Sequence, residues 1–227
     1  MAEFPESPIP PKEFMESWLP GAFGDADLPP GSEDVDVKLG VKLEGSDGGE
    51  WVFHMNQGDL RVTSESRDDT AFTVVQTVID WRGALWEGRG GAFGQGAVAL
   101  FKPGGAQAAD AGGMGGGMSG AAPSPAALEQ MRVLDGVNKM VVAGGEGGDW
   151  SVAFKLGPGA IPDDPTTTVS ITAEDADAMA AGTLDPMQAF MAGRIQVAGD
   201  LTLMMQVQMI QMQAASDDAS GGGGSGS

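Results

Sequence analysis

Residues 164–213 restrict the fold of this chain more tightly than any other part of the sequence. The segment begins with β-branched residues at 166–169, and such side chains pack well on a pleated surface, which predicts a strand. Thr172 then precedes acidic residues and an alanine-rich run, the pattern of an N-cap and a helix that ends at Gly182. The order of these elements predicts an α+β domain.

A second helix is predicted from Asp185 to Met191. Asp at the N-cap and Pro at the first helical position are typical of a helix start, and Gly193 ends the pattern. Residues 194–197 alternate between polar and apolar side chains, which predicts a short strand. A methionine-rich segment, 201–213, follows a Gly-Asp turn. Its spacing fits the alternation of a strand as well as one face of a helix.

Together these elements resemble the sterol carrier protein type 2 family of lipid-binding domains. The resemblance is carried by Asp185-Pro186-Met187-Gln188-Ala189-Phe190-Met191-Ala192-Gly193 and Gly199-Asp200, in this order after the Thr-rich strand. It is strongest over residues 126–215. It implies an α+β fold with a sterol-carrier-like, twisted mixed sheet covered by helices over an apolar tunnel. It also implies that the domain binds lipids without catalysis and that segment 201–213 is a helix.

The implied lipid site lies within residues 126–215. Its expected lining residues are Trp150, Phe154, Met179, Met187, Phe190, Met191, Ile195, Val197, Leu203, Met204, Val207 and Ile210. Methionine suits such a site because its flexible, unbranched side chain can repack around irregular guests. A methionine stripe packed as ordinary core has the same sequence pattern, so both interpretations stay open at this point. Trp51 and Trp150 are interpreted first as core anchors.

The earlier part of the chain repeats landmarks of the later part. Gly48-Gly49-Glu50-Trp51 matches Gly147-Gly148-Asp149-Trp150 at an offset of 99 residues. Asp68-Asp69 matches Asp163-Asp164, and Asp80 before a helix matches Asp175, both at an offset of 95. Ordered landmarks at nearly constant spacing predict a tandem duplication. The first copy is divergent because it lacks the Asp-Pro-Met motif and the long methionine-rich segment.

The predicted organisation has five parts. They are a disordered N-terminus at 1–11, a divergent sterol-carrier-like repeat at 12–103, a Gly/Ala-rich linker at 104–125, a second repeat at 126–215 and a disordered tail at 216–227. Within the repeats, alternation and turn residues predict helices at 12–19, 80–88 and 126–134 and strands at 35–43, 50–55, 60–63, 70–78, 97–101, 137–143 and 151–156. A phosphate-binding glycine loop is a weaker alternative for the linker because the Lys-Ser/Thr pair is missing.

Charge and composition exclude several functions. Across 227 residues, 12 basic and 32 acidic residues give a net charge of −20, which repels nucleic acids and anionic lipid headgroups. Cysteine and tyrosine are absent and His54 is the single histidine, so few side chains suit acid–base or nucleophilic chemistry. Glu33, Asp34 and Asp36 do not have calcium-loop spacing, and turns or caps explain them better than a metal.

The sequence therefore predicts a non-enzymatic protein with no cofactor, no metal and no catalytic residues. The expected ligand is a hydrophobic small molecule such as a lipid or fatty acyl chain. A protein partner or homo-oligomer is possible, and the alternative function is a structural or assembly module that uses the same apolar surfaces for self-association or partner docking. No nucleic-acid partner and no stable membrane association are expected. The N-terminal sequence lacks the features of a secretory signal, so a cytoplasmic location is expected.

Overall fold

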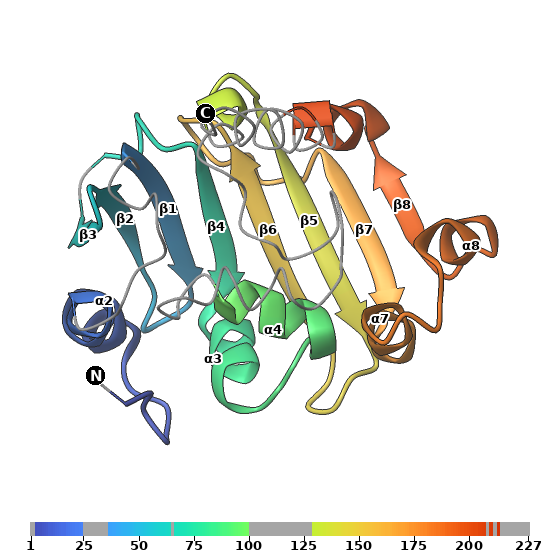
Figure 1. The fold of residues 1–227 in the computed structure, drawn as a ribbon, viewed down its shortest axis with the longest axis horizontal. Helices are drawn as coiled ribbons and strands as arrows, with labels where there is room; N and C mark the ends of the chain where they lie inside the picture. Colours follow the sequence, from blue (N-terminus) through green and yellow to red (C-terminus); the bar gives the residue numbers. More distant parts are fainter. Residues whose placement is uncertain are drawn as a thin grey trace, which may run out of the picture.

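Eight strands form one mixed sheet in the order β3-β2-β1-β4-β6-β5-β7-β8 (Figure 1). The structure is a computed structural model that describes residues 3–24, 36–64, 66–99, 129–207, 209–210 and 213, with the backbone alone at 96–99. We call residues 3–99 the first half and residues 129–213 the second half. The predicted linker at 104–125 and the predicted tail at 216–227 lie outside the described residues.

Each half contributes four strands, and the predicted strands at 35–43, 50–55, 60–63, 70–78, 137–143, 151–156, 166–171 and 194–197 are confirmed within a few residues. In the first half they are β1 (Asp36–Glu44), β2 (Gly49–Asn56), β3 (Asp59–Thr63) and β4 (Phe72–Thr77). In the second half they are β5 (Gly136–Ala143), β6 (Trp150–Leu156), β7 (Thr167–Thr172) and β8 (Gln196–Gly199).

The two halves share one pairing pattern. In the first half β1 is antiparallel to β2 and parallel to β4, and in the second half β5 is antiparallel to β6 and parallel to β7. The parallel pairs end at Glu44 opposite Thr77 and at Ala143 opposite Thr172. These positions have the same offsets of 99 and 95 residues as the sequence landmarks.

The helix that follows each parallel pair also begins in the same way. The Thr77 hydroxyl accepts a hydrogen bond from the Asp80 backbone N–H (3.0 Å) at the start of α3 (Val78–Trp86). The Thr172 hydroxyl accepts one from the Asp175 N–H (3.2 Å) at the start of α7 (Ala173–Ala180). Both caps satisfy an N–H that has no partner within the helix. Thr172 is the cap that the sequence predicts, whereas α3 begins two residues before the predicted helix at 80–88 and is capped by Thr77, not by Asp80.

Antiparallel pairing of β4 with β6 joins the halves edge to edge. The two segments therefore pack against each other through a shared sheet. The mixed α/β fold class is confirmed. The continuity of the sheet means that neither half presents an open edge at the junction.

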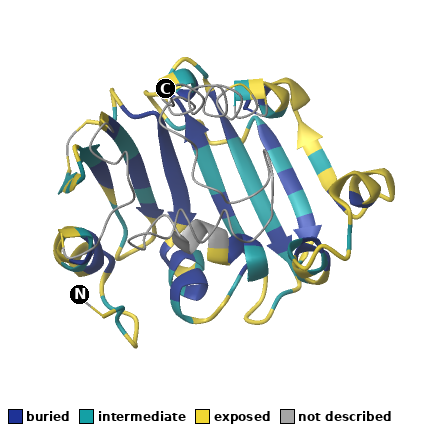
Figure 2. Ribbon diagram, viewed as in Figure 1, coloured by how far each residue is buried: buried dark blue, intermediate teal, exposed yellow. Residues whose placement is uncertain are grey.

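Side chains alternate along each strand, so one face of this sheet is mainly apolar. The other face, which we call the polar face, carries the charged side chains together with buried valines such as Val52, Val75 and Val137. The apolar face carries the side chains that pack into the core, including Val37, Leu39, Val41, Trp51, Phe53, Phe72, Val74, Met140, Val142, Val152, Phe154, Val169 and Ile171. The polar face carries Lys38, Lys42, His54, Arg61, Lys139 and Lys155. Figure 2 shows burial concentrated in the central strands, whereas β8 is largely exposed.

The helix predicted at 12–19 is confirmed as α1 (Pro11–Glu13), a π-helical turn η1 (Phe14–Trp18) and α2 (Leu19–Gly24). Phe14, Met15 and Leu19 are fully buried, as the predicted apolar face requires. The preceding segment was expected to be disordered, but in the structure it contacts these aromatics. The indole N–H of Trp18 donates to the carbonyl of Glu3 (3.0 Å), and that of Trp86 donates to the carbonyl of Pro5 (2.7 Å).

The strand predicted at 97–101 is wrong, because residues 91–99 form α4 (Gly91–Ala99). Phe93 of this helix is buried, and the carboxylate of Asp177 in α7 accepts a hydrogen bond from the backbone N–H of Ala92 (3.3 Å). A cap supplied from another helix and packing against α3 and α7 outweigh the poor helix propensity of a glycine-rich segment. Of the helix predicted at 126–134, residues 129–131 are helical and turns follow.

Candidate functional site

The apolar face of the second half is the place where the structure gathers most of the expected lipid-binding residues. β5, β6 and β7 provide its floor, and Val142, Val152 and Val169 are buried in it. Met140 lies opposite both Val152 and Val169, and it is half-buried together with Phe154. The middle of this face is thus lined by flexible or aromatic side chains that are less completely covered than their neighbours.

Helices α3, α4 and α7 close one end of this face. The indole N–H of Trp150 donates to the carbonyl of Asp80 in α3 (3.1 Å), which fixes the ring beneath that helix. Gly90 lies against the same ring, where a Cβ atom would approach Trp150 Cδ2 to 2.6 Å. The backbone of Gly90 also has φ of +79°, which favours glycine. Phe93 and Met179 are buried at this end.

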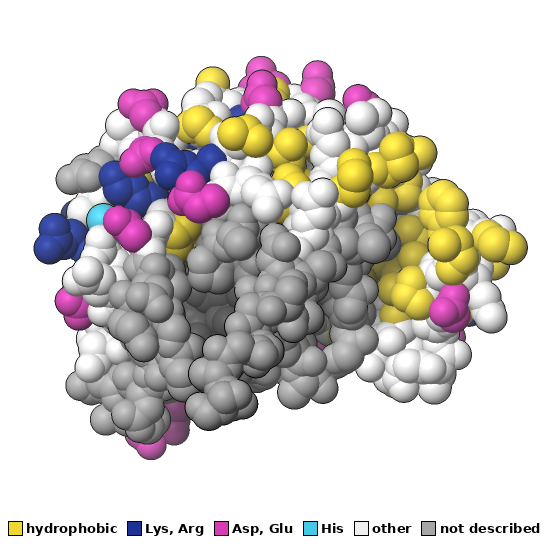
Figure 3. Space-filling model, turned by 45° about the horizontal axis from the view of Figure 1, so that its top comes forward, with side chains coloured by type: hydrophobic (Ala, Val, Ile, Leu, Met, Phe, Trp, Pro, Cys, Tyr) yellow, Lys and Arg dark blue, Asp and Glu magenta, His cyan; other side chains and the backbone are white. Residues whose placement is uncertain are grey.

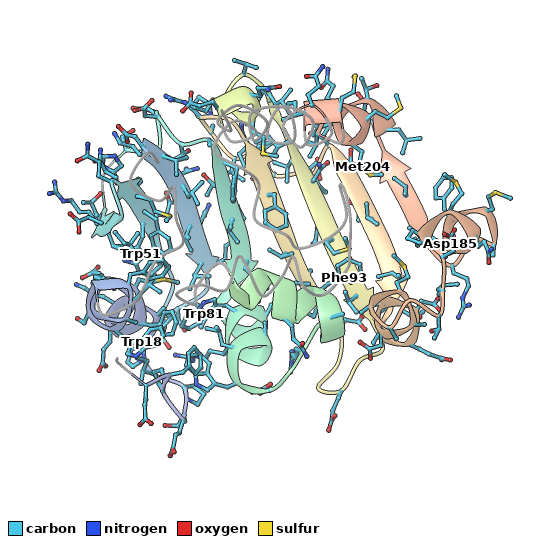
Figure 4. The ribbon with its side chains drawn as sticks, viewed as in Figure 1. Trp18, Trp51, Trp81, Phe93, Asp185 and Met204 are labelled. Carbon is cyan, nitrogen blue, oxygen red and sulfur yellow. The ribbon has the colours of Figure 1, made fainter. Side chains whose placement is uncertain are left out.

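The helix that begins at residue 201 closes the other end. Leu203 and Val207 are buried, and Leu203 lies so close to Gly136 that a Cβ there would meet Leu203 Cδ2 at 2.5 Å. The side chain of Asp200 accepts a hydrogen bond from the Thr202 N–H (2.8 Å) at the start of this helix. The hydrogen bonds from the side chain and backbone of Thr202 lower the pKa of Asp200 from its usual 3.8. Figure 4 shows Met204 and Phe93 toward opposite ends of the strands.

Nine of the twelve expected lipid-binding residues contribute to the core of the molecule. Trp150, Met179, Ile195, Leu203 and Val207 are buried, and Phe154, Val197, Met204 and Ile210 are partly buried against the same core. They come from β6, α7, β8 with the residue before it, Ile195, and the helix from residue 201. The structure therefore brings together residues that are widely separated in the sequence.

The other three expected residues, Met187, Phe190 and Met191, point outward. They belong to α8 (Pro186–Met191), in which Asp185 caps the helix through the Gln188 N–H (3.0 Å) and Ala189 is the one buried residue. The exposed fractions of Met187 and Met191 are 65% and 79%. A helix of this length buries one face, and in α8 the small Ala189 occupies that face.

These side chains extend into a larger exposed apolar surface, which we call the methionine patch. Its members are Met187, Phe190, Met191, Leu201, Met205 and Met209. Figure 3 shows hydrophobic side chains gathered over α8 and the helix from residue 201. Contiguous apolar surface of this kind marks sites of contact with other molecules. The sequence pattern alone could not show which methionines face outward.

Asn138 is a polar residue on the apolar face that the sequence reading missed. Its side-chain Oδ1 is buried and has no hydrogen-bond partner. A signal was available, because Asn138 is 99 residues after Leu39 and interrupts an otherwise apolar position in the alternation of its strand. Buried polar atoms are almost always paired, so an exception calls for an explanation.

Several charged groups of the polar face are paired with acidic side chains. The buried ammonium of Lys155 donates to Asp135 Oδ1 (2.8 Å) and to two backbone carbonyls, and this bond lowers the pKa of Asp135 from 3.8. His54 Nε2 lies 2.7 Å from Asp36 Oδ1, and the hydrogen bond lowers the pKa of Asp36. His54 thus has an acidic partner.

A pocket on the molecule is lined by Glu50, Ser66, Arg67, Asp68, Gly159 and Ala160, a polar set that does not suit a hydrophobic ligand. Within the described ranges, no cluster of three His or acidic residues could hold a metal ion. Every helix in this part of the chain is too short or too polar to cross a lipid bilayer.

The fold and the apolar face define a small α+β domain suited to holding a hydrophobic molecule between sheet and helices. The model of the SCP-2 sterol transfer family matches residues 119–212. The match covers the second half, the part of the chain whose sequence resembles this family. It does not extend to the first half.

Individual relatives match the same share of the chain. Sterol carrier protein 2 of Rattus norvegicus is 34% identical over 92 residues, which are 37% of this chain and 17% of that protein. Hydroxysteroid dehydrogenase-like protein 2 of Xenopus tropicalis is 31% identical over 93 residues, 38% of this chain and 22% of that protein. The chain thus spans about a fifth of the length of these relatives.

Solved structures with detectable similarity include two insect proteins. The sterol carrier protein domain 2 of Helicoverpa armigera is 26% identical, with 40% of this chain and 74% of that chain covered and a TM-score of 0.28. Sterol Carrier Protein 2 Like 2 from Aedes aegypti is 21% identical, with 34% and 75% covered and a TM-score of 0.27. At these TM-scores the structures add no argument to the family match.

Proposed function

We propose that this protein binds a hydrophobic ligand, such as a lipid or fatty acyl chain, on the apolar face of its second half and carries it without catalysis. The observation that carries the proposal is the coincidence of the SCP-2 match with a face whose middle, Met140 and Phe154, is half-buried between two helical ends. Removing apolar surface from water favours uptake by about 25 cal/mol per Å². The titratable groups described above are engaged in ion pairs and caps, in keeping with binding alone.

The test is ligand uptake by the full chain. We expect Nile red fluorescence to rise on addition of the protein, and native mass spectrometry after exposure to a long-chain lipid to show a bound molecule. Phe154→Ala should change this uptake, whereas Leu60→Ala, a truncation on β3 in the first half, should not. A protein that takes up neither dye nor lipid would contradict the proposal.

We further propose that the first half is a divergent copy of the second. Support comes from the offset of 99 residues between Glu44 and Ala143 and the offset of 95 between the caps Thr77 and Thr172, which match the offsets of the sequence landmarks. The first half would then serve as a scaffold that extends the sheet. The proposed ligand site is a tunnel under the helices of the second half. We propose that the nine inward residues line it.

The methionine patch favours a second candidate function, which is self-association or docking to a protein partner. Six large apolar side chains are exposed together, and methionine adapts to varied partners. Light scattering in lipid-free buffer separates the candidates. A mass above that of the monomer, reduced by Met191→Asp, would support assembly, and a monomer with lipid uptake would support carriage alone.

We also propose that the ligand is exchanged through a partner protein and not through a stable membrane contact. The proposed location is cytoplasmic. The net charge of −20 opposes approach to anionic vesicles over about 8 Å at physiological salt. Exchange with anionic vesicles should accelerate as salt is added. Tight vesicle binding that weakens with salt would contradict this part, and cell fractionation tests the location.

A further inference from the structure

The position of Asn138 in the sheet explains why its Oδ1 has no partner. Asn138 lies opposite Phe154 on one side and opposite Thr167 on the other, and Gly136 precedes it and Met140 follows it on the same face. Phe154, Met140 and Gly136 offer no side-chain donor. Thr167 has a hydroxyl, but it donates to the carbonyl of Asp200. The register of the sheet therefore surrounds this amide oxygen with groups that cannot donate to it.

A ligand on the apolar face would meet this amide. We infer that Asn138 selects neutral lipids that carry a hydroxyl group, because such a group can donate to the amide oxygen within an otherwise apolar surface. The inference rests on the proposed function and names the chemical class of its ligand. An unpaired buried acceptor discriminates strongly between molecules with and without a donor.

The charges around the site argue against an ionised carboxylate as the preferred headgroup. Lys139 and Lys155, the lysines of β5 and β6, project from the opposite face of the sheet. Arg194 pairs with Asp175, and Arg132 pairs with Glu129. Among the described residues, no cation of the second half faces the site, and a carboxylate without a counter-charge is poorly accommodated in an apolar environment.

The experiment compares dodecanol, dodecane and laurate as competitors that displace Nile red from the full chain. Wild type is compared with Asn138→Leu, which removes the amide at similar volume, and with Asn138→Val, a β-branched alternative for a strand. Met140→Leu is the matched control, because it changes the neighbouring side chain on the same face without changing polarity. Thermal melting of each ligand-free variant shows whether it is folded.

We expect wild type and Met140→Leu to prefer dodecanol over both other competitors. In Asn138→Leu and Asn138→Val the affinity for dodecanol relative to dodecane should fall about tenfold, which corresponds to about 1.4 kcal/mol. Two results would overturn the inference: equal selectivity in wild type and both Asn138 variants, or a preference of wild type for laurate. Neither result would contradict the proposed function. Failure of wild type to bind Nile red or any competitor would overturn the proposed function itself.

Discussion

The two halves of the sheet share a pairing pattern but fill their apolar faces differently. In the first half, Phe14 packs against Trp18 and Trp81 with ring centroids 4.7 and 5.2 Å apart, and Trp86 contacts Trp81 at 5.4 Å. Figure 4 shows Trp18, Trp51 and Trp81 on this side of the molecule. The described second half has Trp150, Phe154 and Phe190 as its aromatics, and Phe190 faces outward.

The difference extends to equivalent positions. Leu39 of the first half corresponds to Asn138 of the second at the offset of 99 residues, and Phe72 corresponds to Thr167 at the offset of 95. Two apolar residues in one half are thus two polar residues in the other. The apolar face of the first half is already filled by rigid aromatic side chains. The face of the second half, with methionine, valine and one unpaired amide, can accept a ligand. The comparison is in keeping with the proposal that the first half supports the sheet and the second half binds the ligand.

The largest expected effect is on the packing of the first half. Phe14→Ala should lower the free energy of unfolding by about 3–5 kcal/mol, because a fully buried aromatic is replaced by a cavity. Urea denaturation measures this change. The half-buried Phe154→Ala should cost less and should alter lipid uptake, which Phe14→Ala should not. If the two variants lose similar unfolding free energy and Phe154→Ala does not alter lipid uptake, the proposed distinction between the halves is contradicted.

A smaller effect is expected at the aspartates before β5 and at the start of β1. Asp135→Asn should cost about 1 kcal/mol after solvent screening, because the Lys155 ammonium is 1% exposed and loses its anionic partner. Asp36→Asn should cost less, since its partner His54 is more exposed. Chemical denaturation at neutral pH compares them. A larger loss for Asp36→Asn would reverse this ranking.

Both aspartates also predict how stability depends on pH. Their pKa values in the folded protein are lowered below the usual 3.8 by the bonds to Lys155 and His54. Their contributions are therefore fully present above about pH 4, the unfolded value, and are lost as pH falls through the lower folded values. The stability difference between wild type and Asp135→Asn should shrink in that acid range. If the stability difference between wild type and Asp135→Asn persists below this pH range, the ionised Asp135 carboxylate is not its cause.

The smallest expected effect is one that the halves should share. Thr77→Ala and Thr172→Ala each remove an N-cap and should each cost about 1 kcal/mol. Thr→Ser at either site keeps the hydroxyl and should restore most of the loss in thermal melting. Strongly unequal costs would show that the two caps are not energetically equivalent, despite their common place in the pattern.

Much of this fold could be predicted from the sequence because its signals are local. Alternation located β1, and the hydroxyl of Thr172 marked the start of α7. The strand predicted at 97–101 was wrong because α4 is capped by Asp177 from another helix, which no local pattern shows.

The candidate site could be predicted only in part, for a similar reason. The composition of the methionine-rich segments was visible, but the direction of Met187 and Met191 depends on which face of α8 meets the sheet. The isolation of Asn138 depends on strand register, which places Phe154 and Thr167 beside it. Spatial neighbours of this kind become known only when the strands are paired.

The central claim is that the second half binds the ligand and the first half does not. Photolabelling of the full chain with a long-chain alcohol that carries a diazirine, followed by peptide mapping, tests it most directly. The account predicts labels on the apolar face of the second half, at residues such as Met140, Phe154 and Leu203, and their loss when excess dodecanol competes. Labels concentrated on the first half, at Leu39, Phe53 or Phe72, would contradict it.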